Sequence, residues 1–195
     1  MTFTKEALNT TAPLAVDIAA NRASRKWSRK ELIARVLWDF LSFPLFLWTA
    51  RPFWAWRRFV LRLFGAQIGR DVHIYPNVRI AVPWNLEIAD EAAVGDRAIL
   101  YSLGLIRIEK GATISQNAHL CAGTHDHTRP DLPLLKLPIV IGTGAWICAD
   151  AFVGPGVTIG ELSVVGARAV AVRDVPARAI VAGNPARRVG ERKLI

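Results

Sequence analysis

Two histidines, His125 and His127, lie in the run Gly-Thr-His-Asp-His at residues 123–127. A histidine side chain titrates near neutral pH, so it can accept the proton of a hydroxyl group while that oxygen attacks a thioester. His125 is therefore the candidate general base. Asp126 either orients one of the two rings or caps the turn. The alternative is that the histidines only hydrogen-bond a loop to the fold, and this alternative stays open on residue type alone.

The segment that carries these histidines interrupts a repeat of six residues. The repeat shifts by two residues after Leu86 and after Ile106, and it is broken after Leu120. A period of six fits neither an amphipathic helix nor an alternating strand. It predicts three short strands per coil, stacked in parallel around an aliphatic column. We expect residues 67–195 to be mainly β, as a left-handed parallel β-helix of hexapeptide repeats, an exception to right-handed crossovers. The sixteen aliphatic positions are Ile68, Ile74, Ile80, Leu86, Ile88, Val94, Leu100, Ile106, Ile108, Ile114, Leu120, Ile141, Ile147, Val153, Ile159 and Val165.

Small residues and glycines recur at fixed places within each repeat. Four positions after the aliphatic residue the side chain is usually small, as at Ala92 and Ala151. One position after it glycine is frequent, as at Gly69 and Gly142, and we expect this glycine to permit the turn. Residues 126–138, with three prolines, cannot continue the coil. They are predicted to project as a loop, and loops on a rigid scaffold are where catalytic groups concentrate.

Residues 27–66 are rich in aromatic, leucine and arginine side chains and predict an amphipathic helical lead-in to the coils. Ser28 and Glu31 have the spacing of a capping box at a helix start. The longest uncharged stretch, 40–50, is far shorter than the roughly 20 residues that a membrane-spanning helix needs. Two interpretations remain, which do not exclude each other: a helical pair that caps the β-helix, or a helix lying in a membrane interface. Residues 1–26 are weakly patterned and are expected to be flexible.

The composition restricts the partners. A formal charge of +9 fits nucleic acid, an anionic membrane or a phosphorylated cofactor. No nucleic-acid motif is recognisable, so nucleic acid is not expected. Two distant cysteines form neither a disulfide framework nor a metal-binding pair, and no secretory signal begins the chain. We expect a cytoplasmic protein, with peripheral contact at the inner face of the membrane as a further possibility.

Several of these motifs together resemble hexapeptide-repeat acetyltransferases. Over residues 45 to 190 the chain is similar in particular to the colanic-acid-biosynthesis type of acetyltransferase, which has an aromatic, arginine-rich lead-in like residues 51–58. The resemblance rests on Gly-Thr-His-Asp-His (123–127), Pro-Ile-Val-Ile-Gly (138–142) with Ala145, Trp146 and Ile147, Pro-Gly-Val-Thr-Ile-Gly (155–160), and Val-Ala-Gly-Asn-Pro-Ala (181–186).

The resemblance implies a function and a set of site residues. It implies an O-acetyltransferase that moves an acetyl group from acetyl-CoA to a sugar hydroxyl in surface-glycan biosynthesis, with no metal. It implies a homotrimer with active sites between subunits and His125 as the base. The implied cofactor-binding positions are Trp146, Ala149, Ala167, Val172, Arg173 and Arg187.

The acceptor-binding residues follow less directly. Relatives that act on simple sugars often carry an acidic or amide residue in the coil that faces the histidine. Tyr101 and Ser102 are the polar groups of the comparable stretch in this chain. We assign them, with His127, to acceptor binding.

Two other functions fit the same scaffold. One is a zinc-dependent hydratase similar to the γ-type carbonic anhydrases, for which His119, His125 and His127 would be the ligands. The spacing of these histidines departs from the pattern of that family. His73 and His119 are otherwise expected to be structural surface residues. The other function is a non-catalytic scaffold held at a membrane by the helical lead-in.

Overall fold

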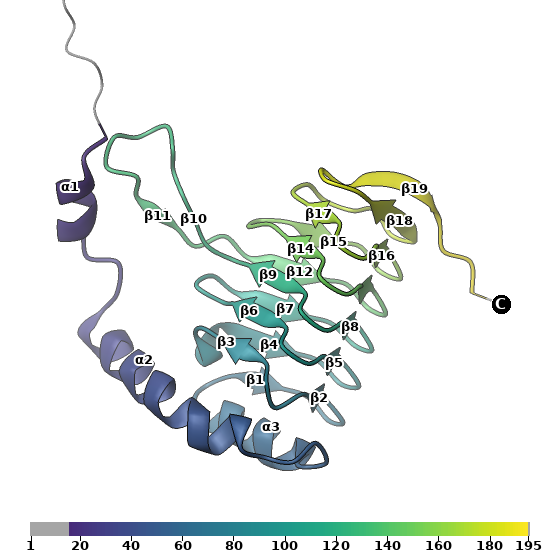
Figure 1. Ribbon diagram of the computed structural model, residues 1–195, viewed down its shortest axis with the longest axis horizontal. Helices are drawn as coiled ribbons and strands as arrows, with labels where there is room; N and C mark the ends of the chain where they lie inside the picture. Colours follow the sequence, from purple (N-terminus) through teal and green to yellow (C-terminus); the bar gives the residue numbers. More distant parts are fainter. Residues whose placement is uncertain (1–15, 195) are drawn as a thin grey trace, which may run out of the picture.

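The computed structural model describes residues 16–194 as a helical lead-in followed by a left-handed parallel β-helix (Figure 1). The strands form three faces, which we call A, B and C in chain order. Face A contains β1 (Gln67–Ile68), β4 (Leu86–Ile88), β7 (Ile106–Ile108), β12 (Ile139–Ile141) and β15 (Thr158–Ile159). Face B contains β2 (His73–Ile74), β5 (Ala93–Val94), β8 (Thr113–Ile114), β13 (Trp146–Ile147), β16 (Val164–Val165), β18 (Ala179–Ala182) and the antiparallel β19 (Arg187–Glu191). Face C contains β3 (Arg79–Ile80), β6 (Ile99–Tyr101), β9 (His119–Cys121), β14 (Phe152–Val153) and β17 (Val170–Ala171). The predicted fold class is confirmed.

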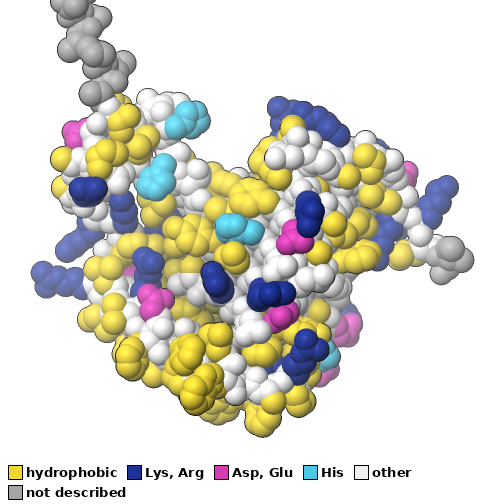
Figure 2. Space-filling view, viewed as in Figure 1, with side chains coloured by type: hydrophobic (Ala, Val, Ile, Leu, Met, Phe, Trp, Pro, Cys, Tyr) yellow, Lys and Arg dark blue, Asp and Glu magenta, His cyan; other side chains and the backbone are white. Residues whose placement is uncertain are grey.

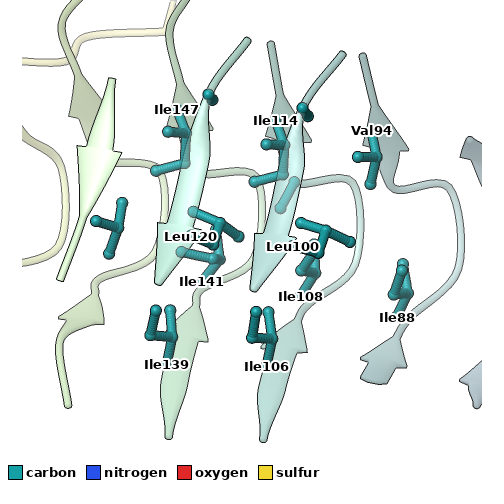
Figure 3. Packing of buried hydrophobic residues seen from close by; sticks show 14 of the residues in the cluster. Ile88, Val94, Leu100, Ile106, Ile108, Ile114, Leu120, Ile139, Ile141 and Ile147 are labelled. Carbon is teal, nitrogen blue, oxygen red and sulfur yellow. The ribbon is translucent and has the colours of Figure 1, made fainter. Parts of the chain in front are cut away.

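The core is the aliphatic column that the repeat predicts. All sixteen repeat positions are buried, and none exposes more than 8% of its surface. Figure 3 shows aliphatic side chains from the three faces meeting inside the coils, for example Ile108, Ile114 and Leu120. The small residues four positions later, such as Ala92 and Ala151, are fully buried as well. Burial on this scale stabilises each Ile or Leu side chain by about 1.5–3 kcal/mol relative to exposure.

The glycines of the repeat have a different role from the expected one. Glycines such as Gly69 and Gly142 do not take a positive φ. A Cβ on Gly142 would instead lie 2.8 Å from the backbone nitrogen of Glu161, so glycine permits the next coil to approach closely. The positive φ falls two residues later, as at Asp71 (52°) and Gly144 (62°).

The two-residue shifts of the repeat all occur at one corner of the coil. From face A to B, and from B to C, consecutive inward residues are six apart, as in Ile68, Ile74 and Ile80. From face C to the next face A the spacing varies: Ile80 precedes Ile88 by eight residues, and Leu100 precedes Ile108 by eight. We call this connection the C-to-A corner. A short 3₁₀ turn, Pro83–Asn85, occupies it in the first coil.

The lead-in consists of α2 (Arg29–Ser42), a π-helical turn (Phe43–Leu47) and α3 (Trp54–Leu63). The predicted capping box is confirmed: Glu31 N–H donates to Ser28 Oγ, and Ser28 N–H donates to Glu31 Oε2. Helix α3 packs against β1 and β2 and buries Val60 and Leu61, so it covers the first coil.

Arginine and tryptophan side chains of the lead-in donate hydrogen bonds to backbone carbonyls of the first coil. In later coils, carbonyls of inward aliphatic residues accept an N–H from the coil below, as Ile88 O does from Gly69 and Val94 O from Tyr75. The first coil has no coil below. Arg62 donates to Ile68 O, Arg57 to Ile74 O at 2.6 Å, and Trp38 Nε1 to Ile80 O at 2.7 Å. These side chains satisfy buried carbonyls that would otherwise lack partners.

The segment that was expected to be flexible includes a short helix in its described part. Residues Ile18–Ala23 form α1, with Asp17 as the N-cap. Residues 1–15 of the same segment lie outside the described residues, so the expectation for them stays a prediction.

Candidate active site

The predicted loop is a two-stranded arm that leaves the C-to-A corner of the third coil (Figure 1). We define the arm as residues 123–138. Its strands β10 (Thr124–His125) and β11 (Leu134–Leu135) pair antiparallel, so it begins slightly earlier than the predicted 126–138. The base of the arm returns over Gly104, where a Cβ would lie 2.8 Å from the carbonyl oxygen of Leu137.

His125 lies on the first strand of this arm with its side chain exposed. Its Nδ1 is 2.6 Å from the carbonyl oxygen of Leu132. A carbonyl can only accept, so Nδ1 carries the hydrogen in the neutral ring, and the tautomer follows from this contact. Nε2 then retains its lone pair, which is the state that a general base needs.

The two residues that follow His125 in the motif, Asp126 and His127, have different surroundings. Asp126 Oδ1 accepts from Thr128 Oγ1 at 2.6 Å and from Thr128 N–H at 3.0 Å. These bonds hold the pKa of the Asp126 carboxyl below its usual value. Asp126 therefore caps the turn, the second of its two predicted roles. His127 is exposed on the arm.

The predicted cofactor residues fall into two groups. Val172, Arg173 and Arg187 line one hollow of about 320 Å³ beside the last coils. Ala149 and Ala167 lie on successive coils at the corner between faces B and C, where Arg168 N–H donates to Ala149 O. A larger hollow of about 730 Å³ on face A, which includes Arg62 and Lys110 in its lining, contains none of the predicted site residues.

Trp146 is the one predicted cofactor residue outside these two groups. Trp146 is exposed on face B, and its Nε1 donates to Ser115 Oγ at 2.8 Å. The turn that carries Val172 and Arg173 leaves the same C-to-A corner as the arm, two coils later. The space-filling view is hollowed between the arm and the C-terminal coils, with histidine side chains beside the hollow (Figure 2).

One predicted acceptor residue is misplaced. Ser102 is fully buried, and its hydroxyl donates to Val82 O and accepts from Val82 N–H. It holds two coils together at their C-to-A corner, so its assignment to acceptor binding is wrong. Tyr101 is 40% exposed at the end of β6.

His119 also differs from the expected surface residue. Its ring packs edge-on against the rings of Tyr101 and Phe152, and its Nε2 is buried with no hydrogen-bond partner among the described residues. Burial lowers the pKa of His119. Within residues 16–194, no three His, Cys, Asp or Glu side chains are grouped so that they could hold a metal ion.

Comparisons with known proteins agree with this arrangement, although no family model matches the chain. The chain is 46% identical over 156 residues to the putative colanic acid biosynthesis acetyltransferase WcaF of Escherichia coli (strain K12), covering 80% of this chain and 86% of that protein. It is 31% identical over 125 residues to the galactoside O-acetyltransferase of the same organism, covering 63% of this chain and 55% of that protein.

Solved structures share the fold. A hexapeptide-repeat acetyltransferase of Vibrio cholerae O1 biovar eltor, complexed with acetyl-coenzyme A, superposes with a TM-score of 0.78 at 24% identity, over 87% of this chain and 93% of that one. A galactoside acetyltransferase in complex with coenzyme A gives a TM-score of 0.77 at 22% identity, over 89% and 88% of the two chains.

The stacked coils and the histidine-bearing arm define the class of left-handed β-helix acyltransferases. Within that class, the 46% identity to WcaF over 80% of this chain shows the family. The chain belongs to the hexapeptide-repeat acetyltransferases, in the family of the colanic acid biosynthesis acetyltransferase WcaF.

Two groups near the histidine were not predicted from the sequence: the Leu132 carbonyl, which contacts His125 Nδ1, and Asn21, which contacts that carbonyl. The Leu132 carbonyl is a backbone group, which no residue pattern carries. Asn21, whose Nδ2 lies 2.6 Å from the same oxygen, belongs to the weakly patterned N-terminal segment.

Proposed function

We propose that the protein transfers an acetyl group from acetyl-coenzyme A to a sugar hydroxyl in surface-polysaccharide biosynthesis, with His125 as the general base. The observation that carries this proposal is the 2.6 Å contact between His125 Nδ1 and Leu132 O. It leaves Nε2 as the free acceptor on an exposed ring. Nε2 takes the proton of the acceptor hydroxyl as its oxygen forms a bond to the thioester carbon, and the bond from that carbon to sulfur then breaks.

The positions of the basic side chains support the cofactor assignment. Arg173 and Arg187 are exposed around the 320 Å³ hollow, and guanidinium groups pair well with the phosphates of coenzyme A. The two groups of cofactor residues lie at different corners of the coil. This separation fits a groove formed between neighbouring subunits, so we propose a homotrimer with shared sites.

The class of acceptor is proposed from similarity to a relative, and the residues that bind it are proposed from the polar side chains that are exposed. The galactoside O-acetyltransferase relative supports a sugar as the acceptor. With Ser102 excluded, Tyr101 and His127 are the polar side chains available for binding it.

The exposed faces of the lead-in support peripheral contact with an anionic membrane. Ile33, Val36 and Phe40 follow helical spacing on α2 and are exposed, Phe40 by 80%. Trp48, in the connection to α3, is 79% exposed. Figure 2 shows apolar side chains gathered along this end of the molecule. No helix among residues 16–194 is long and apolar enough to cross a bilayer.

The membrane proposal is tested by flotation with vesicles of anionic phospholipid. We expect the wild type to float and the double variant Val36→Ser/Phe40→Ser to stay at the bottom. Val189→Ser, which changes an apolar residue 65% exposed on β19, is the matched control and should float. If the double variant floats as well as the wild type, this surface does not contact the membrane.

The catalytic proposal is tested by release of coenzyme A from acetyl-coenzyme A with methyl galactoside and methyl glucoside as acceptors. We expect His125→Ala to lose about a hundredfold or more in kcat, the scale of a general base. His73→Ala, which removes an exposed histidine on β2 of the first coil, is the control and should keep the wild-type kcat. Equal kcat in the wild type and His125→Ala would overturn the assignment.

A further inference from the structure

The orientation of His125 needs more support than the arm itself provides. Two residue pairs form its ladder, Thr124 with Leu135 and His125 with Leu134. An isolated two-stranded hairpin is at best marginally stable in water. Groups outside the arm are therefore needed to fix the ring.

The N-terminal segment supplies these groups. Although more than 100 residues separate them in sequence, α1 lies beside the arm (Figure 1). Asp17 N–H donates to Pro130 O at 2.7 Å, and Asn21 Nδ2 donates to Asp131 O at 2.8 Å. Further along, Lys136 Nζ donates to Lys26 O at 3.0 Å.

A single oxygen links Asn21 to the histidine. The Leu132 carbonyl accepts from Asn21 Nδ2 and from His125 Nδ1, each at 2.6 Å. Leu132 has φ of +42°, a strained conformation that L side chains rarely adopt. Such a conformation persists only where its surroundings hold it in place.

The direction of the Asn21 amide is itself fixed. Asn21 Oδ1 accepts from Lys26 Nζ at 2.7 Å, which leaves the NH2 group to face the arm. Both amide hydrogens then have carbonyl partners, on Asp131 and Leu132. The assignment of oxygen and nitrogen in this amide is thereby consistent with all three contacts.

We propose that Asn21 is a positioning residue for His125. Its amide holds the Leu132 carbonyl where that oxygen fixes the His125 tautomer and ring direction, so the N-terminal segment completes the active site. This inference rests on the proposed role of His125 as the base. Because Asn21 acts through the ring and not on the cofactor, its loss should lower kcat and leave KM for acetyl-coenzyme A nearly unchanged.

The test compares Asn21→Asp and Asn21→Ala with the control Ser24→Ala. Asn21→Asp keeps the size of the side chain but has no donor for the Leu132 carbonyl. Ser24 Oγ donates to Asn21 O at the end of the same helix, and among the described residues Ser24 makes no hydrogen bond to the arm. With acetyl-coenzyme A and methyl galactoside, we expect kcat to fall by about 10- to 100-fold in both Asn21 variants, the scale of a misplaced reacting group. Ser24→Ala should keep the wild-type kcat.

Two further measurements separate positioning from a general loss of structure. The ring ¹⁵N NMR signals of His125 should show the Nδ1–H tautomer in the wild type and a mixture of tautomers in Asn21→Asp. Adding Asn21→Ala to His125→Ala should cause no further loss of kcat, because the two residues act through one ring. An additional loss in the double variant, or a wild-type kcat in both Asn21 variants, would overturn the inference.

The failure of this inference can be told apart from failure of the proposed function. If His125→Ala retains the wild-type kcat, the base assignment is wrong. If His125→Ala is inactive while Asn21→Asp has the wild-type kcat, only the positioning role is wrong.

Discussion

Replacement of Arg57 by methionine tests whether the lead-in completes the first coil. Arg57 is fully buried on α3 and makes four hydrogen bonds. Nε donates to Ile74 O, Nη1 to Thr49 Oγ1 and Ala50 O, and Nη2 to Arg51 O. Methionine can fill the same space and has no donor.

The expected loss follows from these contacts. The carbonyl of Ile74 is buried, and leaving it without a partner costs about 1–3 kcal/mol, while each of the three part-buried bonds contributes about 0.5–1.5 kcal/mol. Removing a desolvated charge offsets some of this, because burial already lowers the pKa of Arg57. We therefore expect Arg57→Met to lower the free energy of unfolding by about 2–6 kcal/mol, a large share of the total stability of a typical domain.

The assay is urea unfolding followed by circular dichroism at a fixed protein concentration, since association would shift the midpoint. Arg58→Met is the matched control. Arg58 is on the same helix and makes one bond, to Val72 O at 3.0 Å. Its loss should cost about 1 kcal/mol or less. If Arg57→Met is no less stable than Arg58→Met, the first coil does not depend on this side chain.

Three further results are expected. Burial places the folded-state pKa of His119 below its unfolded value near 6.5, so the unfolded state binds more protons between the two values. Stability should fall as pH drops through that window, by at most about 1.4 kcal/mol per pH unit, and unfolding of His119→Gln at pH 7.5 and 5.5 should show a smaller fall. Gly104→Ala should lower kcat, because the new Cβ would push Leu137 and the arm outward. Gly154→Ala is the control, because its Cβ would lie no closer than 3.4 Å to a neighbouring atom, and it should keep the wild-type kcat. If Gly104→Ala had the same kcat as Gly154→Ala, a displaced arm would not be the cause. Burial raises the pKa of the Cys148 thiol, so its alkylation by iodoacetamide, followed by mass spectrometry, should be slow at pH 7.5 in the folded protein and fast in urea.

The repeat predicted the coil because its signal is periodic and local. Each inward residue, from Ile68 to Val165, is buried because its own position in the period faces the column. The role of glycine was misjudged for a physical reason. Close approach to a neighbouring coil and a positive φ both favour glycine, and the sequence alone does not distinguish the two.

The sequence points to candidate site residues only where the side chain itself carries the chemistry. His125 stood out by residue type and by its place at the break in the repeat. Ser102 was wrongly assigned because its hydroxyl bonds to Val82 of the neighbouring coil, a contact that depends on how the C-to-A corners of successive coils stack. The Leu132 carbonyl and Asn21 were missed because their contact joins segments more than 100 residues apart.

The place of the arm follows from which corner of the coil can change length. At the corners from A to B and from B to C, a fixed spacing of six keeps the inward residues in line, and an added residue would turn the next aliphatic side chain away from the column. The C-to-A corner tolerates changes in its length. Leu100 precedes Ile108 by eight residues and Leu120 precedes Ile141 by twenty-one, yet Ile108 and Ile141 still pair in register. The shifts of the repeat therefore mark, in the sequence itself, the corner where an arm can be inserted without disturbing the core.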